Sequence, residues 1–388
     1  MSKSSQSVKL PYMEHLTVLI PSTSQPSWGG YSIFDLKEVN CSIHELTIKL
    51  NISAITGLEG EDPNYPNYNP SFFFLQRIEI VINNSIIDTI YPEEQWLRQQ
   101  LFEYDEKRKY LNLLCGDYSD PAQRSNLANV QNDYYIPLWS FFKQTHLNLF
   151  TTAHNVQLRC YWNTAANNIN VGTLEGTPSS TINSGVLLVK LTRYQQNTVS
   201  KLLPQYNIKS KPYTTKFTEL RYGTFVVNGG TASTNIVLTP IVGPVAFLIF
   251  IVRNSANLKG ENYWNFLPVK DWSILDASST NITGGVQISH AEALLLLNKD
   301  NTLSSYSTEN SLSTNDNNAN VYIYAFSGNV TDIIHSGRSL GYHYFRGNEQ
   351  ILINFNEQLT ANVQVDVYAY CDAGIEQTLQ SIKKISIL

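Results

Sequence analysis

Charged residues are scarce in this chain. Aspartate, glutamate, lysine and arginine make up 15% of its 388 residues, whereas an average soluble protein has about 25%. The balance is slightly acidic, with a formal net charge of −5. A protein that binds DNA or RNA through its phosphates needs a basic surface, so we expect no sequence-specific nucleic-acid binding. The low charge also suggests that something other than water covers much of the surface.

Cysteine, glycine and proline are also few. The four cysteines form no Cys-x-x-Cys pair and lie within apolar patterns, at Cys41, Cys115, Cys160 and Cys371. We interpret them as reduced core residues of a protein that folds in a reducing cytoplasm. With 20 glycines and 15 prolines in the whole chain, a collagen-like or low-complexity protein is excluded.

Long hydrophobic runs are missing as well. Residues 1–10 have no apolar segment of the kind that a signal peptide needs. The longest apolar stretch, Ile236–Val252, is interrupted by Pro240, Gly243 and Pro244, and a membrane-spanning helix needs about 20 predominantly apolar residues. We therefore expect neither export by a signal peptide nor a membrane span.

What the sequence does contain is a strong preference for strands. Hydrophobic residues make up 42% of the chain, with 23 tyrosines and 16 phenylalanines, and aromatic residues favour strands. Glu45–Ile52 alternates strictly between apolar and polar residues, which predicts a half-buried strand. Further strands are predicted within Phe72–Ile82, Thr234–Leu238, Val245–Val252 and Val321–Phe326.

Two helices are predicted to interrupt the strands. Pro92–Cys115 opens with Pro-Glu-Glu, carries leucines at near-helical spacing and precedes Gly116. Ser289–Asn298 opens with a serine and a glutamate in capping-box spacing. Each helix lies near the middle of one half of the chain.

A repeat suggests that the two halves are related. Asn155–Tyr161 (NVQLRCY) recurs as Asn362–Tyr368 (NVQVDVY), an offset of 207 residues. The two segments share the phase of their apolar residues, and similar aromatic pairs precede both. We interpret the repeat as duplication of one all-β domain.

The segments between these strands differ. The first half has a polar loop at 165–185 before the strand Val186–Tyr194, whereas the second has a short turn at Cys371–Gly374. A long loop of this kind is usually exposed or functional. Between the halves, Ser200–Phe217 carries four lysines and no acid, and we interpret it as a solvated linker.

These features predict an all-β protein built of two tandem eight-stranded jelly-roll β-barrels with short inserted helices. We divide the chain into an N-terminal arm (1–27), a first jelly roll (28–198), a linker (199–216) and a second jelly roll (217–388). Each unit would have about 170 residues.

Two stretches carry a family resemblance. Tyr135–Phe150, followed by Val156-Gln-Leu, resembles the end of the first barrel in the double jelly-roll major capsid proteins of the PRD1/adenovirus-like viral lineage. Gly341–Arg346, followed by Val365–Tyr370, resembles the closing strands of the second barrel. The resemblance covers both halves in order, and virophage, polinton-like, tailless-phage and large DNA virus types all remain open.

The resemblance implies a structural protein of the virion. Such a chain would assemble as a pseudo-hexagonal homotrimer that tiles an icosahedral shell. Its partners would be other copies of itself and neighbouring capsomers, together with minor capsid and vertex proteins. The N-terminal arm would meet an internal lipid membrane or minor proteins, and the 165–185 loop would form an outward tower.

No catalytic, cofactor-binding or metal-binding residue can be assigned from the sequence. His146 and His154, like His335 and His343, stand eight apart, which fits no usual zinc spacing. Asp332 with His335 is better explained as a turn acid and an ordinary histidine, and Glu59, Glu61 and Asp62 as a solvated loop. We expect no enzyme activity and no cofactor.

Two alternatives remain open at this stage. The first is a two-domain carbohydrate-binding or hydrolytic β-sandwich protein, with Trp28, Trp264 and Trp272 as candidates for stacking on sugars. The second is a minor capsid or vertex protein with the same barrels. The first predicts a monomer that binds glycans.

Overall fold

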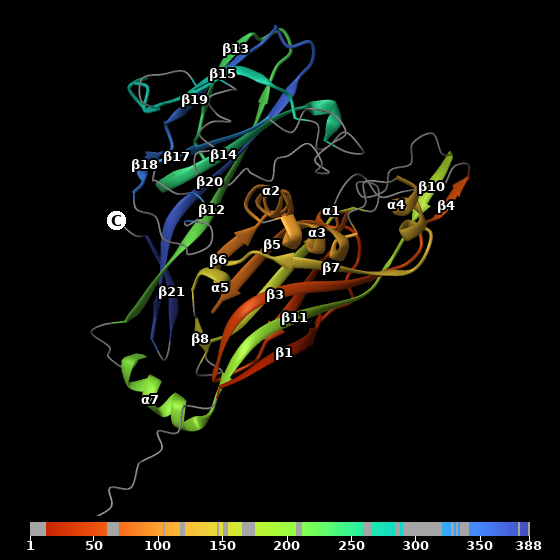
Figure 1. The fold of residues 1–388 in the computed structure, drawn as a ribbon, viewed down its shortest axis with the longest axis vertical. Helices are drawn as coiled ribbons and strands as arrows, with labels where there is room; N and C mark the ends of the chain where they lie inside the picture. The colour runs from red at the N-terminus through yellow and green to blue at the C-terminus, as the bar shows by residue number, and fades with distance from the viewer. Residues whose placement is uncertain are drawn as a thin grey trace, which may run out of the picture.

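A computed structural model shows the fold of the chain (Figure 1). The residues that it describes are 13–59, 70–103, 105–116, 121–145, 147–149, 154–164, 175–206, 212–258, 266–283, 288–289, 320–326, 330, 333, 341–378 and 381–386. The expected helix Ser289–Asn298 lies outside these residues apart from Ser289, which ends a short strand.

The first half contains eleven strands among its described residues, with short helices between them. The strands are β1 (Met13–Pro21), β2 (Tyr31–Leu36), β3 (Cys41–Ile52), β4 (Thr56–Glu59), β5 (Leu75–Ile82), β6 (Ser85–Ile90), β7 (Asn132–Leu138), β8 (Asn148–Leu149), β9 (Val156–Trp162), β10 (Glu175–Ser179) and β11 (Ile182–Tyr194). The helices are α1 (Pro70–Phe73), α2 (Pro92–Phe102), α3 (Asp105–Leu114), α4 (Pro121–Ala128) and α5 (Phe141–Gln144).

Helix α7 (Gln196–Tyr206) precedes the strands of the second half. The strands are β12 (Tyr213–Val227), β13 (Ser233–Val237), β14 (Val242–Asn254), β15 (Val269–Leu275), β16 (Ile288–Ser289), β17 (Val321–Ala325), β18 (His343–Arg346), β19 (Gln350–Phe355), β20 (Val363–Gln377) and β21 (Ile382–Ser386). A single 3₁₀ turn, η1 (Ser255–Asn257), follows β14.

Four sheets form two sandwiches. In the first half, sheet I has the order β1-β11-β3-β7 and sheet II the order β2-β9-β5-β6. In the second half, sheet III has the order β12-β20-β14-β17 and sheet IV the order β13-β19-β15-β16. Every pairing within them is antiparallel. The second half therefore repeats the strand order of the first, and each half is an eight-stranded jelly roll.

The duplication is thus real, but the predicted repeat matches the wrong strands. Asn155–Tyr161 lies largely in β9, in sheet II, whereas Asn362–Tyr368 lies largely in β20, in sheet III. By sheet position, β9 corresponds to β19 and β20 corresponds to β11. An alternating apolar pattern recurs in any inner strand of a sandwich, so seven similar residues do not establish equivalence.

Several predicted connections contain regular structure. The arm expected over 1–27 includes β1, which pairs along all nine of its residues with β11. The 165–185 loop includes β10, which pairs with β4, and the first residues of β11. The linker expected over 199–216 contains most of α7 and the first residues of β12. The turn expected at Cys371–Gly374 is continuous strand within β20.

The helix expected over Pro92–Cys115 is two helices instead. Helix α2 ends before Glu103, whose backbone is extended, and α3 begins at Asp105. The strand expected over Phe72–Ile82 likewise begins later, because α1 occupies Pro70–Phe73. The strand expected over Glu45–Ile52 is confirmed as part of β3, with four of its residues completely or almost completely buried: Leu46, Ile48, Leu50 and Ile52.

Two large hydrophobic cores lie within the described part of the chain. One lies between sheets I and II and extends to one face of β14 and β20, while the other lies between sheets III and IV. Along β14, Phe247, Ile249 and Ile251 belong to the first core, and Leu248 and Phe250 to the second. The inner strands β14 and β20 of sheet III are therefore buried on both faces, which accounts for the uninterrupted apolar run of β14.

Candidate functional site at the junction of the two halves

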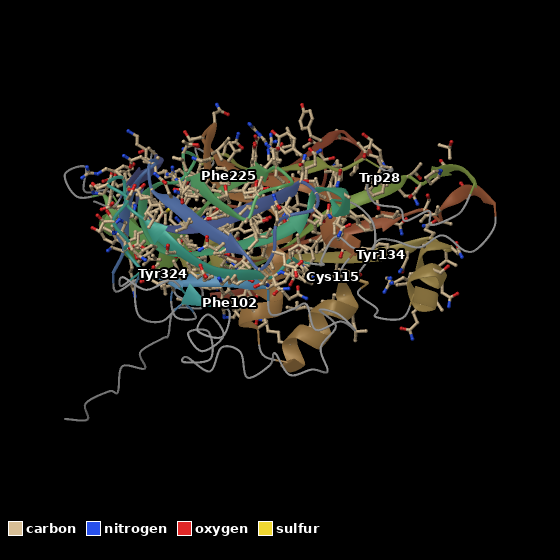
Figure 2. The ribbon with its side chains drawn as sticks, turned by 90° about the horizontal axis from the view of Figure 1, so that it is seen from above. Trp28, Phe102, Cys115, Tyr134, Phe225 and Tyr324 are labelled. Atoms are coloured by element: carbon tan, nitrogen blue, oxygen red, sulfur yellow. The ribbon has the colours of Figure 1, made fainter. Side chains whose placement is uncertain are left out.

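The junction is built by α2, which lies against sheet III of the second half (Figure 1). Phe102, at the end of α2, makes an edge contact with Phe247 at 6.5 Å between ring centroids, and Phe247 stacks on Tyr370 at 4.1 Å. Figure 2 labels Phe102 at this position. These rings bury large apolar areas, so the junction is packed like a protein core.

Helix α2 directs two acids at the second half. Proline at its first position and two glutamates in its first turn suit a helix N-terminus. Glu93 forms an ion pair with Arg253 of β14 and accepts a hydrogen bond from the hydroxyl of Tyr368. Glu94 accepts a hydrogen bond from the hydroxyl of Tyr370. The sequence features that start the helix thus also connect the two sandwiches.

Arg253 is the centre of a buried cluster of charges. It is fully buried, and its guanidinium lies 3.2 Å from a carboxylate oxygen of Asp366, which is also fully buried. The hydroxyl of Tyr222 donates to Asp366 at 2.8 Å, and the amide of Gln364 donates to both of its carboxylate oxygens at 2.9 Å. With Glu93, the cluster holds two carboxylates and one guanidinium. Arg253 and Asp366 are fully buried, whereas the Glu93 side chain is 12% exposed.

A second ion pair lies one turn further along α2. The Arg98 guanidinium is 2.6 Å from Glu94, and both side chains are buried. Arg98 also lies over the rings of Trp139 and Tyr370, at 5.3 and 5.1 Å from their centroids. Gln95 donates its side-chain amide to Glu94 at 2.7 Å. Burial, with the nearby charge of Glu94, raises the pKa of Tyr370 well above its usual range.

Asp88 on β6 is a buried carboxylate beside these pairs. Its oxygen accepts one hydrogen bond, from the backbone N–H of Phe141 at 3.2 Å. Burial raises the pKa of Asp88 to about 6, although the Phe141 N–H and the charges of Lys384 and Arg98 act to lower it. The carboxyl therefore exchanges its proton closer to neutral pH than an ordinary aspartate does.

Two buried hydroxyls share the small cavity beside Asp88. The side-chain oxygens of Ser140, from the first half, and Thr218, on β12 of the second, have no hydrogen-bond partner among the described residues. The cavity has a volume of about 10 Å³, which is close to the minimum for one water molecule. A carboxyl and two hydroxyls from both halves thus converge at one polar point.

The residues singled out in the sequence lie elsewhere. His154 is buried, and burial lowers its pKa. His343 stacks against Phe326 at 5.5 Å between centroids. His146, His335 and Asp332 fall outside the described residues, as do Glu61 and Asp62. Glu59 ends β4, opposite Glu175. Among the described residues, none of these histidines and acids lies beside another as an acid–base pair.

Two of the three tryptophans considered for sugar binding can be placed. Trp272 is fully buried in the second core, with edge contacts to Phe250 and Tyr322. Trp28 is half-buried, makes an edge contact with Phe74 and donates its ring N–H to the carbonyl of Ser180 at 2.9 Å. Trp264 lies outside the described residues. Trp272 therefore has no open face for stacking on a sugar.

The four cysteines are buried and are not joined in disulfides, and burial raises the pKa of Cys41 and Cys371 to about 12. Within the described residues, no three histidine, cysteine or acidic side chains are grouped so as to hold a metal ion. None of the helices described there has both the length and the apolar character to cross a membrane.

Sequence reasoning missed the junction residues. Arg253 directly follows the apolar run Val245–Val252, and Asp366 lies within the predicted repeat. A single charge inside or beside an otherwise apolar strand is the signal that could have found them, because a buried charge requires a partner.

Comparisons with known proteins place the fold. No protein-family model and no curated protein sequence matches the chain. Among solved structures, the Faustovirus major capsid protein is 9% identical, with a TM-score of 0.70, over 97% of this chain and 93% of that one. A chain of the capsid of the virus PBCV-1 is 14% identical, with a TM-score of 0.65, over 99% and 100%. The mavirus major capsid protein is 11% identical, with a TM-score of 0.54, over 100% and 93%.

These likenesses cover both halves of the chain together. The fold is therefore the double jelly roll of viral major capsid proteins, as the two stretches of sequence resemblance predicted.

Proposed function

We propose that this chain is a viral major capsid protein, a structural protein of the virion without enzyme activity. The observation that carries the proposal is that two jelly rolls of the same strand order follow one another along the chain, and that the likeness to the Faustovirus protein covers almost the full length of both chains. A partial likeness would fit one barrel of many unrelated proteins, because the jelly roll is common. A tandem pair with a packed junction is far more specific.

The proposed assembly is a homotrimer. Two similar barrels in each subunit give three subunits six similar barrels, and a closed cyclic trimer of this kind tiles as a pseudo-hexagon in an icosahedral shell. We propose that the barrels divide near the predicted linker, 199–216, with the first extended at its N-terminal side to include β1. Neighbouring trimers would be the chief partners.

Surface features support self-association. Strand β1 is the outermost strand of sheet I in the described part of the chain, and none of its nine residues is buried. Met13 and Leu19 on this strand are 47% and 64% exposed. An open strand edge with apolar side chains is a typical place for another chain to pack. We place a subunit contact there.

Further contacts concern the ends and the loops. Residues 1–12, together with the start of β1, would contact minor capsid proteins or an internal membrane beneath the shell. Strands β4 and β10 form a two-stranded ribbon at one end of the first half (Figure 1). With residues 165–174, which precede β10 in the sequence, this ribbon is the proposed outward tower.

The alternative of a carbohydrate-binding protein loses support from Trp272, whose ring is enclosed. A minor capsid or vertex protein with the same barrels would share the fold. Light scattering coupled to size-exclusion chromatography separates these hypotheses, followed by electron microscopy of the purified protein. We expect a trimer that packs into hexagonal arrays. A stable monomer that binds glycans would contradict the capsid assignment, and a trimer or pentamer that never forms arrays would favour the vertex protein.

A further inference from the structure

A cavity of about 290 Å³ opens at the junction, beside the start of α2. Its walls come from both halves: Tyr91 and Glu93 from the first, and Tyr222, Leu258 and Tyr368 from the second. A cavity of this size is near the lower end of those that bind small molecules. The strand packing and the ion pairs described above do not explain why this space is left unfilled.

Five of the lining residues are aromatic, and three of them, all tyrosines, lie in a row. The rings of Tyr91 and Tyr222 are 4.8 Å apart between centroids, and those of Tyr222 and Tyr368 are 5.1 Å apart and stacked. The face of an aromatic ring carries partial negative charge and attracts cations. The hydroxyls of Tyr222 and Tyr368 are directed to carboxylates of the buried cluster. The hydrogen bonds thus hold these two rings at the edge of that cluster.

The cavity is also electrically negative. Among the described residues that line it, Glu93 alone is charged. Glu93 shares the single guanidinium of Arg253 with Asp366, so the three ionised groups carry a net charge of −1. Arg253 and Asp366 are fully buried, and the field of a buried charge is weakly screened. The nearby cation on β5, Arg77, is occupied by Glu79 at 3.0 Å.

From these observations we propose that the cavity is a binding site for a small organic cation, an ammonium, amidinium or guanidinium group on an apolar or aromatic body. The apolar body would contact the tyrosine rings, and the cation would lie near Glu93 and balance the excess negative charge of the cluster. Gln76, an exposed residue on the rim, and Asn163 provide polar groups for orientation. The proposal does not depend on a role in a capsid.

The test compares three ligands of nearly the same shape but different charge: benzamidine, benzamide and benzoate. Binding to the purified full-length protein is measured by isothermal titration calorimetry at low salt. We expect benzamidine to bind about tenfold or more tightly than benzamide, which corresponds to at least about 1.4 kcal/mol, and benzoate to bind least. Equal affinity for benzamidine and benzamide, or no binding of benzamidine, would overturn the proposal.

Variants locate the site. Glu93→Gln brings the cluster to zero net charge while Arg253 keeps Asp366 as a partner, so the preference for benzamidine should disappear. Because Glu93→Gln also removes a contact of the junction, two further variants are needed that leave the junction intact. These are Gln76→Lys and Gln76→Glu, which change the charge at the rim of the cavity. We expect the lysine variant to bind benzamidine several-fold more weakly than the wild type and the glutamate variant more tightly. Unchanged affinity in both rim variants would place any binding elsewhere and refute the site.

Discussion

Asp88 offers a direct test of the junction, because its burial has a calculable cost. Its pKa rises from 3.8 to about 6 in the folded protein, and each pKa unit corresponds to about 1.4 kcal/mol. The folded state thus binds a proton more tightly than the unfolded chain does. The sign follows: the group has no cost below about pH 4, destabilises the fold increasingly as the pH rises towards 6, and costs about 3 kcal/mol above that.

Asp88→Asn removes the charge and keeps the shape. At pH 7.5 we expect the variant to be more stable than the wild type by up to about 3 kcal/mol, with the Ser140 and Thr218 hydroxyls available to its amide. At pH 4 the difference should shrink towards zero. Urea unfolding of both proteins from pH 4 to 7.5 measures the difference, in which the other acids cancel. Glu357→Gln, at an exposed position, is the control and should show no such trend. A difference between wild type and Asp88→Asn that stays constant with pH would refute the reasoning.

Three further predictions concern other parts of the molecule. Arg253→Met should lower the free energy of unfolding by about 3–5 kcal/mol, because the buried carboxylate of Asp366 and the partly exposed one of Glu93 lose their cation. Arg221→Met, at a partly exposed pair, should cost less than about 1 kcal/mol, and equal effects of the two variants in urea unfolding would contradict the buried cluster. The cysteines should not react with Ellman's reagent in the native protein and all four should react in urea; rapid reaction of the native protein would show an accessible thiol. Deleting residues 165–174 should leave the oligomer measured by light scattering unchanged. Deleting residues 165–185 should disrupt folding, because it removes β10 and the start of β11. If the protein lacking 165–185 were well folded, these strand segments would contribute little to stability.

The sequence allowed the fold class to be predicted because strand patterns are local. The alternation in β3 and the apolar run of β14 follow from which faces of each strand are covered. Strand β1 was missed because residues 1–27 were interpreted as an N-terminal arm. Within it, however, Leu16, Val18 and Ile20 alternate with polar or exposed residues. The break between α2 and α3 was missed because apolar spacing continues across Glu103.

The junction was beyond reach of the sequence for a different reason. Glu93 and Arg253 are 160 residues apart, and Glu94 and Tyr370 are 276 apart. Which sheet faces which helix depends on how the two sandwiches dock, and no local pattern encodes that. A buried charge in an apolar strand indicates that a partner exists, but only the three-dimensional arrangement identifies it.

The predicted repeat is informative at the one polar position where its copies differ. Arg159 in β9 stands where Asp366 stands in β20, within otherwise similar residues. Strand β9 alternates between buried and half-buried residues, so Arg159 lies on a partly exposed face and donates a hydrogen bond to Gln157. In β20 both faces are buried, and Asp366 is paired with Arg253. Two strands with the same apolar phase thus have different surroundings, and the charged residue at the matched position of each strand suits its own surroundings. One side of β20 would face water in an isolated jelly roll but is an interior face in this protein. The ion cluster and the tyrosines of the junction lie on this side, and they border the cavity.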